Sequence, residues 1–216
     1  MDCRFCQFDN IENKVIDHDS VILSSESYYS ISSVGGFLPG WVLVCPQNHD
    51  VNLINHYDNS AFWDMCENME QALSHTYSEN VTIFEHGPSL TGSLTGCGVN
   101  HAHIHLLPLN FSLEEEVKVF DPSLKWEKVK SSEINEIVNG REYLFISDNF
   151  NSSNTEGLLH ILEQPISQFF RQVIASKINK IDIFDYKTHP HYESTDETSQ
   201  KLCDFFERTH QLSVAI

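Results

Sequence analysis

The pattern of apolar and polar positions divides the first half of the chain into short strands around one long helix. Residues 15–31 alternate loosely, which predicts two short strands joined by a turn at 24–27. A continuous apolar run at 41–45 predicts a buried strand, and the run at 81–84 predicts another that ends at Glu85. Between them, a helix is expected from Asn59 or Ser60 to about Tyr77. Its core face recurs at helical spacing: Phe62, Met65, Cys66, Met69, Leu73 and Tyr77.

The second half of the chain continues with helices and one pair of strands. We expect helices at 113–119 and 133–138, from Pro165 to about Ile178, and at 198–210, with strands at 141–147 and 157–162 that form a hairpin. The whole pattern predicts an α+β fold with an antiparallel sheet. We expect residues 1–109 to form one domain and 110–216 to form a folded mixed α/β C-terminal extension packed on it.

Three histidines lie at alternate positions in the segment 101–108. A strand has a side-chain period of two, so His101, His103 and His105 are expected on one face, with Ala102, Ile104 and Leu106 buried on the other. Imidazole serves near neutral pH as nucleophile, acid–base group or metal ligand. A fortuitous cluster on a solvated strand face is the alternative interpretation.

A glycine-rich turn at 92–100 leads directly into this histidine run, which disfavours the fortuitous cluster. Glycines let backbone N–H groups approach an oxyanion closely, and hydroxyls add donors. A turn of this kind in front of a histidine run predicts phosphate chemistry.

Charge and composition narrow the class of partner. The 216 residues carry a net charge of −18, which argues against nonspecific binding to nucleic acid or acidic membranes. A small phosphorylated ligand is still compatible, because N–H donors, a few cations and protonated histidine can make a positive pocket. No apolar run approaches the roughly 20 residues that span a bilayer, and Met1–Arg4 lacks the start of a signal peptide. We therefore expect a cytoplasmic protein.

Six scattered cysteines include one C-x-x-C pair, Cys3 and Cys6. The pair is compatible with half a zinc site, a redox couple or two buried small residues, but no strand precedes it as in thioredoxin-like redox units. His49, after the strand at 41–45, and His101 are candidates for two further ligands. Two thiolates and two imidazoles make a closed tetrahedral structural zinc site.

Together these residues resemble the histidine-triad (HIT) superfamily of nucleotide hydrolases and transferases. The segment 101–107 fits the His-φ-His-φ-His-φ-φ signature, 40–49 is similar to the strand and turn before the family's helix, and Cys3–Cys6 is similar to its N-terminal zinc half-site. The resemblance covers about residues 3–109. Residues 110–216 resemble the C-terminal extension of larger bacterial members.

The resemblance implies a role for each candidate residue. His103 would attack the α-phosphorus of a nucleotide or dinucleoside polyphosphate, and His105 would donate to a phosphate oxygen or the leaving group. Backbone N–H groups of the loop before the histidines would hold the phosphate oxygens, namely those of Gly96, Cys97, Gly98 and Val99. A structural zinc would be held by Cys3, Cys6, His49 and His101, and a homodimer is usual in the family.

Two departures from the family pattern bear on the substrate. No acidic residue lies between Tyr28 and Trp41, where many members bind the ribose hydroxyls, and the Gly-Gln-Ser/Thr that often precedes the triad is replaced by Gly96-Cys97-Gly98. Glu85 stands where an Asn or Gln is common, and Asn100 immediately precedes the triad; both are candidate substrate-binding residues.

Other side chains have less defined expectations. Arg171 could grip a distal phosphate, although an exposed helix arginine is the commoner outcome, and His86 is expected to be a solvated loop residue. Two further functions remain open: a catalytically weak nucleotide-binding protein of the same fold, and a hydrolase whose three histidines bind a catalytic metal.

Overall fold

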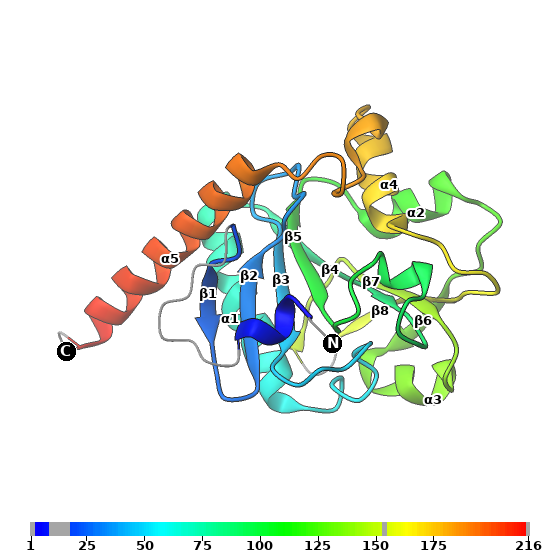
Figure 1. Ribbon diagram of the computed structural model, residues 1–216, viewed down its shortest axis with the longest axis horizontal. Coiled ribbons are helices and arrows are strands. Elements are labelled where there is room, and N and C mark those ends of the chain that lie inside the picture. Colours follow the sequence, from blue (N-terminus) through cyan, green and yellow to red (C-terminus); the bar gives the residue numbers. More distant parts are fainter. Residues whose placement is uncertain (1–2, 9–17, 153–154, 215–216) are drawn as a thin grey trace.

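The computed structural model describes residues 3–8, 18–152 and 155–214, and it confirms the α+β class (Figure 1). The strands are β1 (Val21–Ser24), β2 (Tyr28–Ser32), β3 (Val42–Pro46), β4 (Asn80–Gly87), β5 (Ile104–Leu109), β6 (Glu127–Lys130), β7 (Tyr143–Ser147) and β8 (Glu156–Ile161). The α-helices are α1 (Ser60–Tyr77), α2 (Leu113–Phe120), α3 (Ile134–Val138), α4 (Phe169–Lys177) and α5 (Tyr192–Val214). Short 3₁₀ turns include η1 (Phe5–Phe8) and η2 (Leu94–Gly96). Among the described residues no helix is both long and apolar enough to cross a bilayer.

The eight strands in the described part of the chain join one antiparallel sheet in the order β1-β2-β3-β5-β4-β7-β8-β6. The hairpins β1–β2 and β7–β8 are as predicted. Residues beyond 109 supply β6, β7 and β8, and β7 pairs along β4. The division at residue 109 therefore falls between neighbouring strands of one sheet, and it stays a prediction.

The two faces of the sheet are buried by different elements. On one face, Val42, Val44, Ile83, Ile104 and Leu106 pack with α1 in the largest core cluster. Ala102 joins Ile104 and Leu106 there, as the period of two predicted. The helix α1 has the expected cap, since the Asn59 side chain accepts from the N–H of Ala61.

The opposite face has two separate covers. Towards one end, Phe84 and Leu107 pack with α2 and α4; towards the other, Leu43 and Cys45 pack under Phe5 of η1. Figure 1 shows η1 in front of β2 and β3, with α4 at the far side of β5 and α1 behind the sheet.

Several element boundaries differ from prediction. β5 begins at Ile104, so His101 and His103 precede the strand, and β4 runs on to Gly87 rather than ending at Glu85. α4 begins at Phe169 rather than Pro165, because Gln168 has a left-handed backbone (φ 55°) that no helix continues through.

Other differences lie at the edges of the fold. α5 is longer than expected at both ends, and Figure 1 shows it extending beyond the sheet. The strand β6 was not predicted, because its sequence EKVK is mostly polar and only Val129 is buried. The expected strand residues Val15 and Ile16 lie outside the described residues.

Candidate functional site

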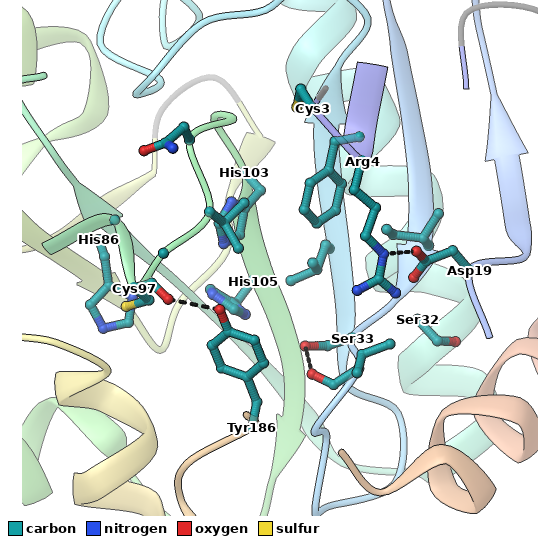
Figure 2. Close-up of a pocket in the computed structure, with 18 of the residues that line it drawn as sticks. Cys3, Arg4, Asp19, Ser32, Ser33, His86, Cys97, His103, His105 and Tyr186 are labelled. Carbon is teal, nitrogen blue, oxygen red and sulfur yellow. Dashed lines mark hydrogen bonds and ion pairs between the residues drawn. The ribbon is translucent and has the colours of Figure 1, made fainter. Parts of the chain in front are cut away.

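A cavity of about 310 Å³ opens on the sheet between η1 and α4 (Figure 2). His103 and His105 line it, with Gly96, Cys97, Gly98, Val99 and Asn100 of the glycine-rich loop, Arg171 and His86. Sequence reasoning did not find several further lining side chains, among them Arg4, Asp19, Ser32, Ser33 and Tyr186. They come from the N-terminal segment, β2 and the segment before α5, far apart in the chain, so no local pattern marks them.

The ring of His103 is held by a backbone carbonyl. Its Nδ1 lies 2.8 Å from the carbonyl oxygen of His101. A carbonyl only accepts, so Nδ1 carries the proton and Nε2 carries the lone pair. Phe5 stacks on the ring with centroids 6.1 Å apart. His103 is therefore held in the tautomer that a nucleophile needs.

The ring of His105 is held in the opposite tautomer. The indole Nε1 of Trp41 donates to His105 Nδ1 over 2.9 Å. An indole N–H only donates, so Nδ1 is unprotonated and the proton is on Nε2. His105 therefore has an N–H donor at Nε2, whereas His103 has a lone pair at Nε2. The centroids of the two rings are 4.9 Å apart.

Both imidazoles are neutral at neutral pH. Burial lowers the pKa of His103 to about 4, although its bond to the His101 carbonyl acts in the opposite direction. Burial also lowers the pKa of His105 well below its ordinary value, and the nearby His103, His86 and Arg171 add to this. These two rings therefore do not supply positive charge to the pocket, since desolvation disfavours the charged ring.

The glycine-rich loop is fixed by side chains from the second half of the chain. Cys97 has a left-handed backbone (φ 57°), and its carbonyl accepts from the Tyr186 hydroxyl over 2.7 Å. The N–H of Gln168 donates to the Cys97 sulfur over 3.0 Å. Burial raises the pKa of this thiol, so Cys97 lacks the thiolate character of a nucleophile.

Only some of the loop's N–H groups are available to a ligand. Those of Cys97 and Val99 donate within the turn, to the carbonyls of Leu94 and Gly96. Those of Gly98 and Asn100 have no hydrogen-bond acceptor among the described residues. The Asn100 side chain is occupied in the loop, where it accepts from the N–H of Gly92 over 2.7 Å.

Arg171 is buried, contrary to the exposed position expected for a helix arginine. It is 4% exposed and lines the cavity. Its guanidinium donates to the carbonyls of Gly35 and Val34 and to the Ser33 hydroxyl, and it lies 4.4 Å from the centre of the Trp41 ring. The loop at 33–35 therefore receives this cation from a helix that is distant in the sequence.

Glu85 was expected to bind substrate and His86 to be a solvated loop residue, but it is His86 that lines the cavity, because β4 is longer than predicted. Glu85 points to the α1 face of the sheet, where it is 1% exposed and accepts from the hydroxyls of Tyr57 and Tyr143 and the N–H of Leu53. It does not line the cavity, so its position does not support substrate binding. His86 lies on the cavity face and is buried rather than solvated, with its ring 6.0 Å from His105. Alternation along β4 would have given this result had the strand been extended to Gly87.

The four predicted metal ligands come together at the rim of the cavity. The ligand atoms of Cys3, Cys6, His49 and His101 all lie within 4.8 Å of one another. Cys6 Sγ is 3.2 Å from His49 Nδ1 and 3.6 Å from His101 Nδ1, and Cys3 Sγ is 3.5 Å from His101 Nδ1. Ligands 2.0–2.3 Å from a tetrahedral ion would be roughly 3.3–3.8 Å apart.

His101 is also oriented as a metal ligand requires. Its Nε2 donates to the carbonyl of Pro46 over 2.8 Å, which leaves Nδ1 unprotonated and directed at the two sulfurs. The four residues therefore fit a metal ion in both donor set and spacing. A site made of the three histidines alone is not formed, since His103 and His105 are turned to the cavity and held by other partners.

Comparisons with known proteins give weak likenesses. No protein-family model and no curated protein sequence matches the chain. Among solved structures, a Hit-like protein involved in cell-cycle regulation from Bartonella henselae is 14% identical, with a TM-score of 0.34 over 42% of this chain and 66% of that one. A hypothetical histidine triad nucleotide-binding protein from Sulfolobus tokodaii is 12% identical, with a TM-score of 0.40. That match covers 94% of this chain and 98% of the Sulfolobus chain. The interpretation of the site therefore depends on its own geometry.

Proposed function

We propose that the protein is a nucleotide hydrolase or transferase of the histidine-triad kind, which uses His103 as a nucleophile on the α-phosphate of a nucleoside phosphate ester, anhydride or phosphoramidate. The observation that carries this is the pair of opposite tautomers. The neutral ring of His103 has its lone pair on Nε2, and the neutral ring of His105 has its N–H on Nε2. Both rings line the same cavity. Nucleophile and donor are thus prepared before the substrate arrives, which is the arrangement covalent catalysis needs.

The reaction has two steps. His103 Nε2 attacks the α-phosphorus, the bond from phosphorus to the leaving group breaks, and a nucleotidyl-imidazole forms. The Nε2–H of His105 stabilises the negative charge that develops on the departing or non-bridging oxygen. Water then attacks the phosphorus, the P–N bond breaks, and the products are a nucleoside monophosphate, a proton and the neutral His103 ring.

The glycine-rich loop supplies further donors to the phosphate. Gly98 and Asn100 line the cavity, and their N–H groups have no acceptor among the described residues. Preorganised N–H donors of this kind stabilise a phosphoryl transition state without reorganisation at the moment of reaction. The remaining lining residues of the loop, Gly96, Cys97 and Val99, shape the wall of the cavity.

We infer that Cys3, Cys6, His49 and His101 hold a structural zinc ion. Two cysteines and two histidines form the closed donor set that zinc prefers in structural sites. Such an ion would tie the N-terminal segment to the residues before β5, and so hold Phe5 against His103. We also propose that residues 110–216 shape one wall of the cavity, since Arg171 and Tyr186 line it. A homodimer and a cytoplasmic location stay predictions.

The second candidate is a protein that binds nucleotides without turning them over. What favours it is the departure of the loop from the family pattern at Gly96-Cys97-Gly98, which offers no side-chain hydroxyl or amide to the leaving group. Both candidates require nucleotide binding, and only the first requires a covalent intermediate.

Intact-protein mass spectrometry after a brief acid-free quench separates the two candidates. The zinc-loaded protein is mixed with a panel of adenylylated substrates, beside the variants His103→Ala and His160→Ala. His160 is a matched control, because its Nδ1 also donates to a carbonyl, that of Lys125, but it lies outside the cavity. We expect a transient adenylyl adduct on the wild type and on His160→Ala, and none on His103→Ala. Nucleotide binding with neither adduct nor turnover from any substrate would establish the binding protein instead.

A further inference from the structure

Arg171 is a buried cation with no carboxylate among its hydrogen-bond partners in the described part of the chain. Its guanidinium donates only to neutral acceptors among the described residues, the carbonyls of Gly35 and Val34 and the hydroxyl of Ser33. No carboxylate lies within ion-pair distance of it among the described residues. A guanidinium has five N–H donors, and these three bonds leave two for another partner.

The cavity lining has more basic than acidic residues, whereas the protein as a whole is strongly acidic. The chain has 31 acidic and 13 basic residues, yet the lining contains two arginines and a single acid, Asp19. That acid is already paired with Arg4. The net charge of the lining therefore comes from Arg171, and this charge faces a cavity rather than the surface.

A second cation lies near the loop on the same side. The Nζ of Lys187 lies 2.9 Å from the place that a Cβ on Gly98 would occupy. The hydroxyl of its neighbour Tyr186 donates to the Cys97 carbonyl, and the Tyr186 ring lies 5.6 Å from the Arg171 guanidinium. Figure 2 shows Tyr186 between the Cys97 side of the cavity and the Ser33 side.

Arg171 is also close to the reacting groups. Its charge contributes to the lowered pKa of His86, His103 and His105. Burial lowers its own pKa to about 10, which still leaves it charged at neutral pH. A buried charge without a partner is unfavourable, and an anion that enters the cavity removes this penalty.

We propose that Arg171 forms a second anion subsite, and that the substrate carries a second phosphate besides the one that His103 attacks. This inference rests on the proposed function, because it concerns a nucleotide bound in the same cavity. Two sources supply the second phosphate: the next phosphate along the 5′ chain, or a phosphate on the ribose. The guanidinium suits either, since its charged N–H groups form strong hydrogen bonds with phosphate oxygens.

Calorimetric titration of the zinc-loaded protein with AMP, ADP and adenosine 3′,5′-bisphosphate tests the subsite. We expect at least one doubly phosphorylated nucleotide to bind ten or more times more tightly than AMP at the same ionic strength. A preference for ADP identifies the 5′ chain, and a preference for the bisphosphate identifies the ribose. Equal affinity for all three overturns the subsite while leaving nucleotide binding in place. Failure of all three to bind overturns the proposed function together with the subsite.

Two variants show whether Arg171 carries the preference. Arg171→Gln removes the charge, and Ser33→Asp keeps the arginine but places a carboxylate next to its guanidinium. Both should reduce the preference to less than threefold, because each change weakens the binding of the doubly phosphorylated nucleotide more than that of AMP. Arg141→Gln is the matched control, because Arg141 also donates to backbone carbonyls, those of Ile137 and Val138, but outside the cavity. If both site variants fold and keep the full preference, Arg171 only braces the loop at 33–35 and the proposal is wrong.

Discussion

The indole of Trp41 donates a hydrogen bond of 2.9 Å to His105, and this one bond decides which nitrogen of His105 carries its proton. Trp41 precedes β3, His105 lies in β5, and β3 pairs with β5 in the sheet. The bond is therefore made by strand pairing rather than by any local sequence. Arg171 stacks on the same indole, so Trp41 touches both the donor histidine and the buried cation.

Replacing Trp41 with phenylalanine should lower kcat with little effect on KM. The change keeps an aromatic ring but removes the N–H, so the His105 proton can move to Nδ1 and leave no donor at Nε2. We expect a loss of about 100-fold in kcat, the low end of what a positioned proton donor contributes, and a stability loss of about 1 kcal/mol from the hydrogen bond. Steady-state kinetics and thermal unfolding measure the two effects.

The control for this change is Trp126→Phe. Trp126 packs against the α2–α4 core, and its indole N–H has no partner within the described residues. Its replacement should leave kcat unchanged. A similar loss of kcat in both variants would mean that tryptophan packing matters, and not the tautomer of His105.

Metal content should follow the two cysteines. The wild type should contain about one zinc per chain, and Cys3→Ser should lower this severalfold together with the melting temperature, because a ligand that binds only the native state stabilises it. Elemental analysis measures the zinc content, and thermal unfolding with and without a chelator measures the melting temperature. Cys203→Ser, in α5 and outside the cluster, should retain the metal. Full metal content in Cys3→Ser would contradict the assignment.

Glu85 should make stability fall as pH rises from about 4.5 to about 7. Burial raises the pKa of this carboxyl from 4.5 to about 7, although the hydroxyls of Tyr143 and Tyr57 and the N–H of Leu53 oppose the rise. In that interval the native state binds more protons than the unfolded state, so unfolding becomes easier as pH rises. A shift of this size corresponds to roughly 3 kcal/mol at most.

Denaturant unfolding of the wild type and Glu85→Gln at several pH values isolates this contribution. The buried histidines, whose pKa values are lowered, act in the opposite direction, so the difference between the two proteins is the informative quantity. We expect Glu85→Gln to gain stability relative to the wild type between pH 5 and pH 8. Glu136→Gln, which changes an exposed carboxylate, should follow the wild type throughout. A pH-independent difference for Glu85→Gln would refute the titration.

Gly98→Ala should weaken nucleotide binding more than Gly92→Ala does. Both glycines have φ values near +85°, so each substitution should cost about 1 kcal/mol in backbone strain. Gly98 lines the cavity and has Lys187 against it, whereas nothing lies within 4 Å of a Cβ at Gly92. Titration with AMP, alongside thermal unfolding, should show equal stability losses and a weaker affinity for Gly98→Ala only. Equal AMP affinities of the two variants would mean that the phosphate does not bind at the glycine-rich loop beside Gly98.

Much of the fold could be read from the amino-acid pattern. The helix from Ser60 to Tyr77 and the two hairpins follow from residues that are neighbours in the chain, and the structure confirms them. The predictions were wrong for elements whose own residues carry little apolar pattern, namely β6 and the end of β4. The polar strand β6 is stabilised by pairing with β8, and β4 continues to Gly87 because β7 pairs along it.

The same distinction applies to the site. The sequence by itself determined the donor types, since the alternating histidines, the glycine-rich loop and the C-x-x-C pair are each contiguous patterns. Tertiary structure alone decided the tautomer of His105, the face on which Glu85 and His86 lie, and the burial of Arg171 against the loop at 33–35. The physical reason is that tautomer, desolvation and charge pairing depend on which groups meet in space, and α4 and β3 reach this cavity from opposite parts of the chain.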